Sequence, residues 1–176
     1  MKLLQPTRIG GVELKNRIVM PAMHLGYCKG GYINEQIISF YRERALGGAG
    51  LIVVGGCNID PYPAYWGMVE IGDDKFIPGH RQMVSSIQEA GAKACAQLFQ
   101  AGRYASSVFS KRQPIAPSAI PSTMTRETPR EMTIEDIRQV IGDFASAARR
   151  VKEAGYDLVE VIASAGYLIS EFLSPI

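Results

Sequence analysis

The sequence lacks several features that would assign it to a well-defined class. No apolar run approaches the roughly 20 residues that cross a bilayer, and the N-terminus has no apolar signal-peptide core. The three cysteines, Cys28, Cys57 and Cys95, are far apart and odd in number, which fits reduced thiols better than disulfides or a metal site. These absences predict a soluble, cytoplasmic protein that does not bind membranes.

Two further absences bear on function. The 19 basic and 17 acidic residues are spread through the chain, and no basic block of the kind that binds nucleic acid is visible. The glycine-rich dinucleotide pattern and the P-loop pattern are both absent, and the two histidines, His24 and His80, show no metal-ligand spacing. Nucleic acid and metal ions are therefore not expected as partners.

The chain does contain four short apolar runs separated by helical patterns. Uninterrupted β-branched runs, rather than strict alternation, predict strands that are buried on both faces of a parallel sheet. A hairpin-like stretch around Gly10 and Gly11 precedes the first run. The predicted strands are 17–22, 49–56, 93–98 and 157–162.

Three helices are predicted between these strands. Asn34 caps the first, which runs to about Leu46 and ends at Gly47, and the second spans 78–90, with His80 expected at its surface. Thr133 caps the third, which ends at Gly155. Its predicted inner stripe comprises Ile134, Ile137, Val140, Ile141, Phe144, Ala148 and Val151.

This alternation of strands and helices predicts an α/β fold with a right-handed parallel sheet. The connection 102–132 carries four prolines and is expected to be a long functional loop. It follows a strand directly, so it is expected at the carboxyl edge, where parallel α/β enzymes place their chemistry. The residues alone thus indicate about half of a parallel α/β enzyme.

Individual site signals remain open at this level. Gly55 and Gly56 end a strand, where they allow close approach of a ligand or simply turn the chain. Gln97 lies in a predicted buried strand, where its amide satisfies core polar groups or faces a heteroaromatic ring. His24 directly follows the first strand and is a better site candidate than His80.

Four segments, taken in order, resemble motifs of the Old Yellow Enzyme family of FMN-dependent oxidoreductases: 9–23, 96–104, 113–120 and 166–175. The segments 20–26 and 164–168 resemble most closely the bacterial 2,4-dienoyl-CoA reductase branch. The resemblance implies a TIM (β/α)8 barrel, of which 1–176 forms the N-terminal half of one domain, with four βα units, truncated after strand four. It also implies FMN as cofactor and NAD(P)H as reductant.

By this resemblance, the backbone at Ala22, Met23 and His24 touches the flavin ring, and Gly56 leaves room for it. Gln97 matches the amide that reads the pyrimidine edge of the flavin. The implied reaction is reduction of an activated C=C bond in an enoate, enone or dienoyl thioester, with hydride passing from NAD(P)H through the flavin.

Tyr167 matches the proton donor of the family. A tyrosine with its ordinary pKa of about 10 stays protonated at neutral pH and can act as a general acid; the plainer alternative is that Tyr167 packs against the sheet edge. Arg103 and Tyr104 are candidates for substrate binding, although Arg103 is equally plausible as a structural residue. Ile162 and Ala165 replace the family's usual carbonyl-binding pair, as in the dienoyl-CoA reductase branch, which disfavours simple enals and enones.

The resemblance also sets expectations about completeness. Strands 17–22 and 157–162 are open edges, and the residues expected to clamp the flavin phosphate are not among those matched. We expect a piece of a longer reductase, or a chain that oligomerises or needs the other half of the barrel. A 4Fe-4S cluster is expected only in a longer form. The alternative is a catalytically silent half-barrel that serves as an assembly module.

Overall fold

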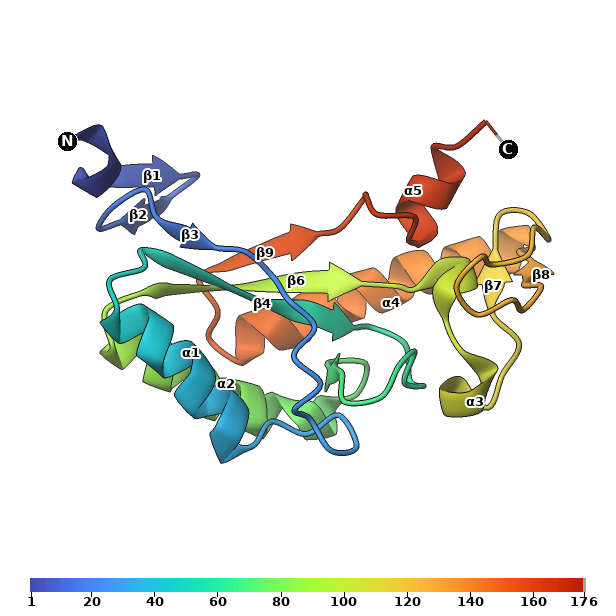
Figure 1. The fold of residues 1–176 in the computed structure, drawn as a ribbon, viewed down its shortest axis with the longest axis horizontal. Coiled ribbons are helices and arrows are strands. Elements are labelled where there is room, and N and C mark those ends of the chain that lie inside the picture. Colours follow the sequence, from blue (N-terminus) through green and yellow to red (C-terminus); the bar gives the residue numbers. More distant parts are fainter. Residues whose placement is uncertain (176) are drawn as a thin grey trace.

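A computed structural model describes residues 1–175 and shows a twisted parallel sheet with helices packed on one face (Figure 1). The strand order is β3-β4-β6-β9, and the short β5 pairs with β4. The strands are β3 (Val19–Met20), β4 (Leu51–Asn58), β5 (Val69–Glu70), β6 (Lys93–Phe99) and β9 (Leu158–Val161). The main helices are α1 (Glu35–Leu46), α2 (Ile77–Glu89) and α4 (Ile134–Glu153).

The four predicted strands are confirmed in their predicted order, and all their pairings are parallel. The first is much shorter than 17–22, because only Val19 and Met20 pair with β4. The outer strands of this path, β3 and β9, each pair on one side only, as predicted. The sheet is thus an open one, as expected of a partial barrel.

The predicted hairpin is confirmed as β1 (Thr7–Ile9) and β2 (Val12–Leu14), which follow a short 3-10 helix, η1 (Lys2–Leu4). Leu14 is buried against Leu51, Val53 and Cys95 on the sheet face opposite the helices. The hairpin therefore covers the amino-terminal half of this face and leaves the carboxyl-terminal half free for other groups.

The helix starts follow from their caps. Asn34 accepts a hydrogen bond from the Ile37 amide at 3.1 Å, which satisfies one of the free donors at the start of α1. Thr133 and Asp136 form a reciprocal capping box at the start of α4, where Thr133 Oγ1 accepts from the Asp136 amide and Asp136 accepts from the Thr133 amide. Both predicted starts are confirmed.

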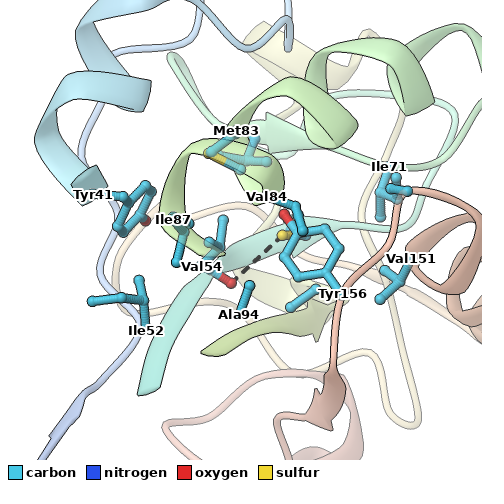
Figure 2. Packing of buried hydrophobic residues seen from close by; sticks show 14 of the residues in the cluster. Tyr41, Ile52, Val54, Ile71, Met83, Val84, Ile87, Ala94, Val151 and Tyr156 are labelled. Carbon is cyan, nitrogen blue, oxygen red and sulfur yellow. Dashed lines mark hydrogen bonds between the residues drawn. The ribbon is translucent and has the colours of Figure 1, made fainter. Parts of the chain in front are cut away.

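The main core lies between the sheet and the helices. Figure 2 shows side chains of α1 and α2 packed against those of β4 and β6. Ile52 of β4 is the register partner of Ala94 of β6, as Val54 is of Ala96, and all four side chains lie in this core. The fully buried large residues of this core include Tyr41, Ile37, Ile52, Met83 and Ile87.

Part of the predicted inner stripe of α4 is wrong. Val140 and Val151 are buried, but Ile134 and Ile141 are 64% and 63% exposed. Strand β9 is likewise not buried on both faces, since Val159 and Val161 are each 48% exposed. The common reason is position: no further described strand or helix packs outside β9, so the apolar residues on that side have no neighbour among residues 1–175.

The expected surface position of His80 is also wrong, because its ring is completely buried. Position 80 shares a face of α2 with Met83, Val84 and Ile87 and so points into the core. Its Nε2 lies 3.0 Å from the Glu70 carbonyl oxygen, which only accepts, so Nε2 donates and Nδ1 accepts from the Tyr156 hydroxyl at 2.8 Å. Burial lowers the pKa of His80 to about 4.

This neutral histidine gives a prediction for acid stability. The unfolded chain binds a proton at a histidine with a pKa of about 6.5, whereas folded His80 does so only near pH 4. His80 therefore makes the unfolding free energy rise with pH between about 4 and 6.5, by up to about 1.4 kcal/mol per pH unit. We expect this rise to be absent in His80→Gln, measured by urea denaturation against pH. The carboxyl groups of Glu70 and Asp60 contribute equally to the pH dependence of both proteins, so their contributions cancel when the two profiles are subtracted. If the unfolding free energies of the two proteins changed in parallel with pH, the neutral state assigned to His80 would be wrong.

The connection 102–132 is not the structureless loop that was expected. It contains a 3-10 turn η3 (Gly102–Tyr104), a short helix α3 (Ser107–Ser110) and the paired strands β7 (Ile115–Ala116) and β8 (Arg130–Glu131). Its prolines lie between these elements rather than in a continuous coil. The segment is therefore an ordered unit at the carboxyl edge of the sheet.

All three cysteines are buried free thiols. Burial raises the pKa of Cys28 and of Cys95 to about 12, so neither presents a reactive thiolate. Within residues 1–175, no group of histidine, cysteine and acidic side chains is arranged to hold a metal ion. None of the helices in that range has the length and apolar character needed to span a membrane.

Candidate functional site

The candidate site lies at the carboxyl edge of the sheet, where the segments after β3, β4, β6 and β9 meet (Figure 1). In parallel sheets this edge holds ligands because all strands end there. The segment after β9 leads into the short helix α5 (Leu168–Phe172), and Tyr167 directly precedes it. Of the predicted site residues, Met23, His24, Gly56, Arg103, Tyr104 and Tyr167 lie in segments at this edge.

A narrow crevice brings together three of the predicted cofactor residues. Met23, His24 and Gly56 line it together with Gly55, and it is too narrow to admit a water molecule. Met23 is 44% exposed and His24 is also exposed, so this surface is open to a flat group lying over it. Ala22 instead packs with the Leu14 cluster on the sheet face and does not line the crevice.

Glycine at position 56 has a reason within the protein itself. A Cβ atom there would lie 2.9 Å from the Phe99 Cβ, closer than real Cβ contacts allow. The pairing of β4 with β6 also shifts register between Val54 and Cys57, so the strand is irregular at this point. The need for glycine thus follows from packing against Phe99, whether or not a ligand is present.

Gln97 lies on the carboxyl-terminal half of β6 and is only half-buried, not enclosed as its strand suggested. Its Nε2 donates to Glu160 Oε1 at 2.5 Å, and the two residues are register partners in β6 and β9. Glu160 was missed by the sequence reasoning. The sequence feature that could have identified it is a single charged residue inside an apolar strand, because such a side chain needs a hydrogen-bonding partner or contact with solvent.

Tyr167 is held by aromatic neighbours from other segments. Its ring packs edge-to-face on Phe99, with centroids 4.5 Å apart, and on Tyr104, with centroids 6.1 Å apart. Tyr65 also packs against Phe99, with ring centroids 6.2 Å apart. Tyr167 therefore packs at the sheet edge, as the plainer alternative held, yet remains half-exposed at the carboxyl edge, as the functional role requires.

Arg103 and Tyr104 form the turn η3 beside Tyr167. The Arg103 amide donates to Glu171 Oε1 at 2.9 Å, while its guanidinium Nε lies 4.0 Å from the same oxygen. The guanidinium carbon is 5.4 Å from the centre of the Tyr104 ring. The backbone of Arg103 is thus fixed by Glu171, while its guanidinium Nε has no hydrogen-bond partner among residues 1–175. Burial raises the pKa of Glu171.

Three segments named for their resemblance meet at one cavity of about 260 Å³. Arg103 comes from 96–104, Ser118 from 113–120 and Ser170 from 166–175. Glu171, which sequence reasoning missed, also lines it and fixes the turn at 102–103. The cavity lies beside Gly166, directly next to Tyr167.

Ile162 and Ala165 lie in the segment between β9 and Tyr167. Ile162 packs in the apolar cluster that includes Phe99 and Tyr167, and Ala165 is exposed with a positive φ of 61°. Neither side chain can donate a hydrogen bond to a carbonyl group. The structure therefore places only apolar side chains at these two positions.

Comparisons with known proteins agree with this architecture. A metal reductase of Desulforamulus reducens is 55% identical over 174 residues, which is 99% of this chain and 26% of that protein. A solved morphinone reductase in complex with tetrahydroNAD matches 99% of this chain and 53% of its own, with a TM-score of 0.93 and 27% identity. A solved 2-naphthoyl-CoA reductase with 2-naphthoyl-CoA matches 99% of this chain and 29% of its own, with a TM-score of 0.92 and 31% identity.

The chain spans between a quarter and about half of the length of these proteins. Their likeness extends over the whole sheet and its carboxyl edge, since nearly every residue of the chain is matched. The model of the NADH:flavin oxidoreductase / NADH oxidase family matches residues 2–176. The chain therefore belongs to this family, that of the Old Yellow Enzymes, and represents part of its TIM barrel.

Proposed function

We propose that this chain supplies the acid and the ring-binding surface of an FMN-dependent oxidoreductase that reduces an activated C=C bond with NAD(P)H. The observation that carries the proposal is the placement of Tyr167. Phe99 and Tyr104 hold its ring at the carboxyl edge, to which Gln97 and the crevice at Gly56 also belong. A hydrogen-bonding edge, a flat surface and an acid thus share one side of the sheet.

The residues present fit the ring of a flavin better than its phosphate. Gln97 has one N–H committed to Glu160, which leaves its carbonyl oxygen and second N–H for the alternating donor and acceptor groups of a pyrimidine edge. The exposed segment at Met23 and His24, beside the glycine pair, offers a flat surface. The residues that line this crevice include no lysine or arginine, so it offers no cationic side chain to a phosphate.

Each residue then has a defined task. Bound FMN would supply hydride exchange between NAD(P)H and the β-carbon of the alkene. Gln97, oriented by Glu160, would fix the ring in the plane of the crevice. Tyr167 would deliver the phenolic proton to the α-carbon, and its packing between Phe99 and Tyr104 would limit rotation of the ring and so preorganise the transfer.

For the substrate, we propose a conjugated thioester or a similar acyl compound rather than a simple enal or enone. Ile162 and Ala165 offer no donor to a substrate carbonyl, which disfavours compounds that rely on a hydrogen bond at these two positions. The related 2-naphthoyl-CoA reductase, solved with its thioester, supports this class. A 4Fe-4S cluster in a longer form stays a prediction.

A second proposal concerns assembly. Apolar side chains next to the last strand are exposed, Val159 and Val161 on β9 and Ile141 on α4, and β9 has one unpaired edge. We propose that further βα units cover this side in the working enzyme, because morphinone reductase has nearly as much chain again beyond the part that this chain matches. A second copy, or a silent assembly module without flavin, is the alternative.

Flavin titration separates these proposals. Because the crevice offers contacts to the ring and no cationic partner to the phosphate, we expect FMN and riboflavin to bind the chain with dissociation constants within about threefold of each other. A phosphate held by charged groups would add ~1.5–3 kcal/mol, or roughly 10–150-fold in favour of FMN. Flavin fluorescence quenching measures both constants.

Gln97→Leu should weaken both flavins together, since it removes the ring-edge hydrogen bonds, while Gln82→Leu on the exposed side of α2 serves as the matched control. Failure of the wild-type chain to take up either flavin would support the silent module. A strong preference for FMN would show that other residues of the chain hold the phosphate.

A further inference from the structure

A buried pair of one acid and one amide, Glu70 and Asn58, lies at the end of β4. Glu70 of β5 is only 4% exposed, and its Oε2 accepts from Asn58 Nδ2 at 2.8 Å; the two residues are register partners. The other oxygens of the pair, Glu70 Oε1 and Asn58 Oδ1, are also buried. Neither has a hydrogen-bond partner among residues 1–175.

The orientation of the Asn58 amide is fixed by its neighbours. Nδ2 also donates to the Tyr62 carbonyl oxygen at 2.8 Å and lies 3.3 Å from that of Asp60. Carbonyl oxygens only accept, so the nitrogen must lie on this side and Oδ1 on the other. Two buried acceptor oxygens are therefore left without a donor, an arrangement that is costly unless a proton is supplied.

We propose that Glu70 is a carboxylic acid in the folded protein, that its hydroxyl donates to Asn58 Oδ1, and that this pair positions the segment 59–68 beside the site until Glu70 ionises. An acid and an amide side by side exchange two hydrogen bonds, O–H to the amide oxygen and N–H to the acid carbonyl. That exchange satisfies both orphaned oxygens with a single proton.

The groups packed around Glu70 favour its neutral form. Burial is the main reason that the pKa of Glu70 rises to about 8, and Asp60 raises it further, while Asn58 and the cation Lys75 of η2 (Asp74–Phe76) lower it. Burial raises the pKa of Cys28 to about 12 and lowers that of His80 to about 4, so neither changes charge near pH 8. Burial also raises the pKa of Asp60 to about 7, so a test must separate Asp60 from Glu70.

The Glu70–Asn58 pair positions the segment 59–68, which forms one wall of the candidate site. Asn58 holds the carbonyl oxygens at the start of 59–68, and this segment carries Tyr65, whose ring lies 6.3 Å from that of His24. Ionised Glu70 would place a carboxylate against Asn58 Oδ1, and the amide would have to turn away from the segment. Glu70 is thus a positioning residue for the wall; its effect on catalysis rests on the proposed function, whereas its protonation does not.

The only tryptophan, Trp66, lies in this segment and reports on it without flavin or substrate. We expect Trp66 fluorescence of the full chain to change with a midpoint near pH 8. Glu70→Gln, whose amide still donates to Asn58, should keep the neutral-pH spectrum and abolish the transition. Two control variants should keep the fluorescence transition: Asp60→Asn, which removes the neighbouring acid, and Glu89→Gln, which removes an exposed acid on α2.

A wild-type chain without this transition, or a transition that persists in Glu70→Gln, would overturn the proposal. Glutamate-selective ¹³C labelling of the wild-type chain gives a test that needs no stable variant. One side-chain carboxyl should titrate near pH 8, and titration of every glutamate near the ordinary pKa of about 4.3 would also overturn the proposal. In the flavin-loaded enzyme, loss of alkene turnover above pH 8 in the wild type but not in Glu70→Gln would extend the role to catalysis.

Discussion

Replacing Tyr167 with phenylalanine is expected to slow alkene reduction by ~10²–10⁴-fold, the range typical for loss of a positioned general acid. The same change should leave the reduction of bound flavin by NAD(P)H nearly intact, because that half-reaction needs no proton on carbon. The aromatic packing with Phe99 and Tyr104 involves the ring and not the hydroxyl, so the fold should be retained. Stopped-flow absorbance measures the two half-reactions separately in the flavin-loaded enzyme.

Tyr32→Phe is the matched control, because Tyr32 is 51% exposed and packs on Phe76 away from the crevice. It should leave both half-reactions unchanged. Equal losses in the two half-reactions of Tyr167→Phe would show that Tyr167 shapes the flavin surface rather than giving the proton. That result would support the alternative in which Tyr167 only packs at the sheet edge.

The second large effect concerns stability. Ile87 on α2 is completely buried in the main core, whereas Ile141 on α4 is 63% exposed. We expect Ile87→Ala to lower the unfolding free energy by ~2–5 kcal/mol, through lost burial and the cavity left behind. The same substitution at Ile141 should change it by less than about 0.5 kcal/mol, since little burial is lost and alanine favours helix. Urea denaturation of the two variants measures the contrast.

The comparison of Ile87→Ala with Ile141→Ala also tests whether another chain covers α4. If a second copy or another polypeptide covers the outer side of the sheet, Ile141→Ala loses an interface contact and its cost rises with protein concentration. A cost for Ile141→Ala that is small and independent of concentration supports an uncovered face in the isolated chain. Comparable costs at both positions would contradict the exposure that the structure gives Ile141.

Local signals accounted for most of the fold. Asn34 and Thr133 marked two helix starts correctly, because a cap requires only a side-chain oxygen and a free amide a few residues away. The uninterrupted apolar runs located β4 and β6, which are buried between the helices and the hairpin. These features depend on neighbours in the sequence, so the sequence contains them.

Predictions failed where a distant neighbour decides the outcome. Periodicity identified the apolar face of α4, but not whether a further element covers Ile134 and Ile141. His80 lies on the buried face of its own helix, and its burial depends on Tyr156, which is remote in sequence. A polar residue on an apolar helix face was the available signal.

The candidate site shows the same division. The resemblance placed Met23, His24 and Gly56 on one surface, and the structure brings them to one crevice. It gave no reason to expect Glu160 beside Gln97 or Glu171 under η3, since these contacts join separate strands and loops. The ligand roles of these residues stay predictions until flavin binding is measured.

The hydrogen bond between His80 and Tyr156 spans 76 positions and has a consequence for synthesis of the chain. When α2 has left the ribosome, His80 still lacks its partner, so a nascent core that closed around it would trap an unpaired ring nitrogen. The core can be completed only after Tyr156 emerges, immediately before β9 and Tyr167. Translation thus delivers Tyr156, the partner of His80, just ahead of the segment that carries the proposed acid.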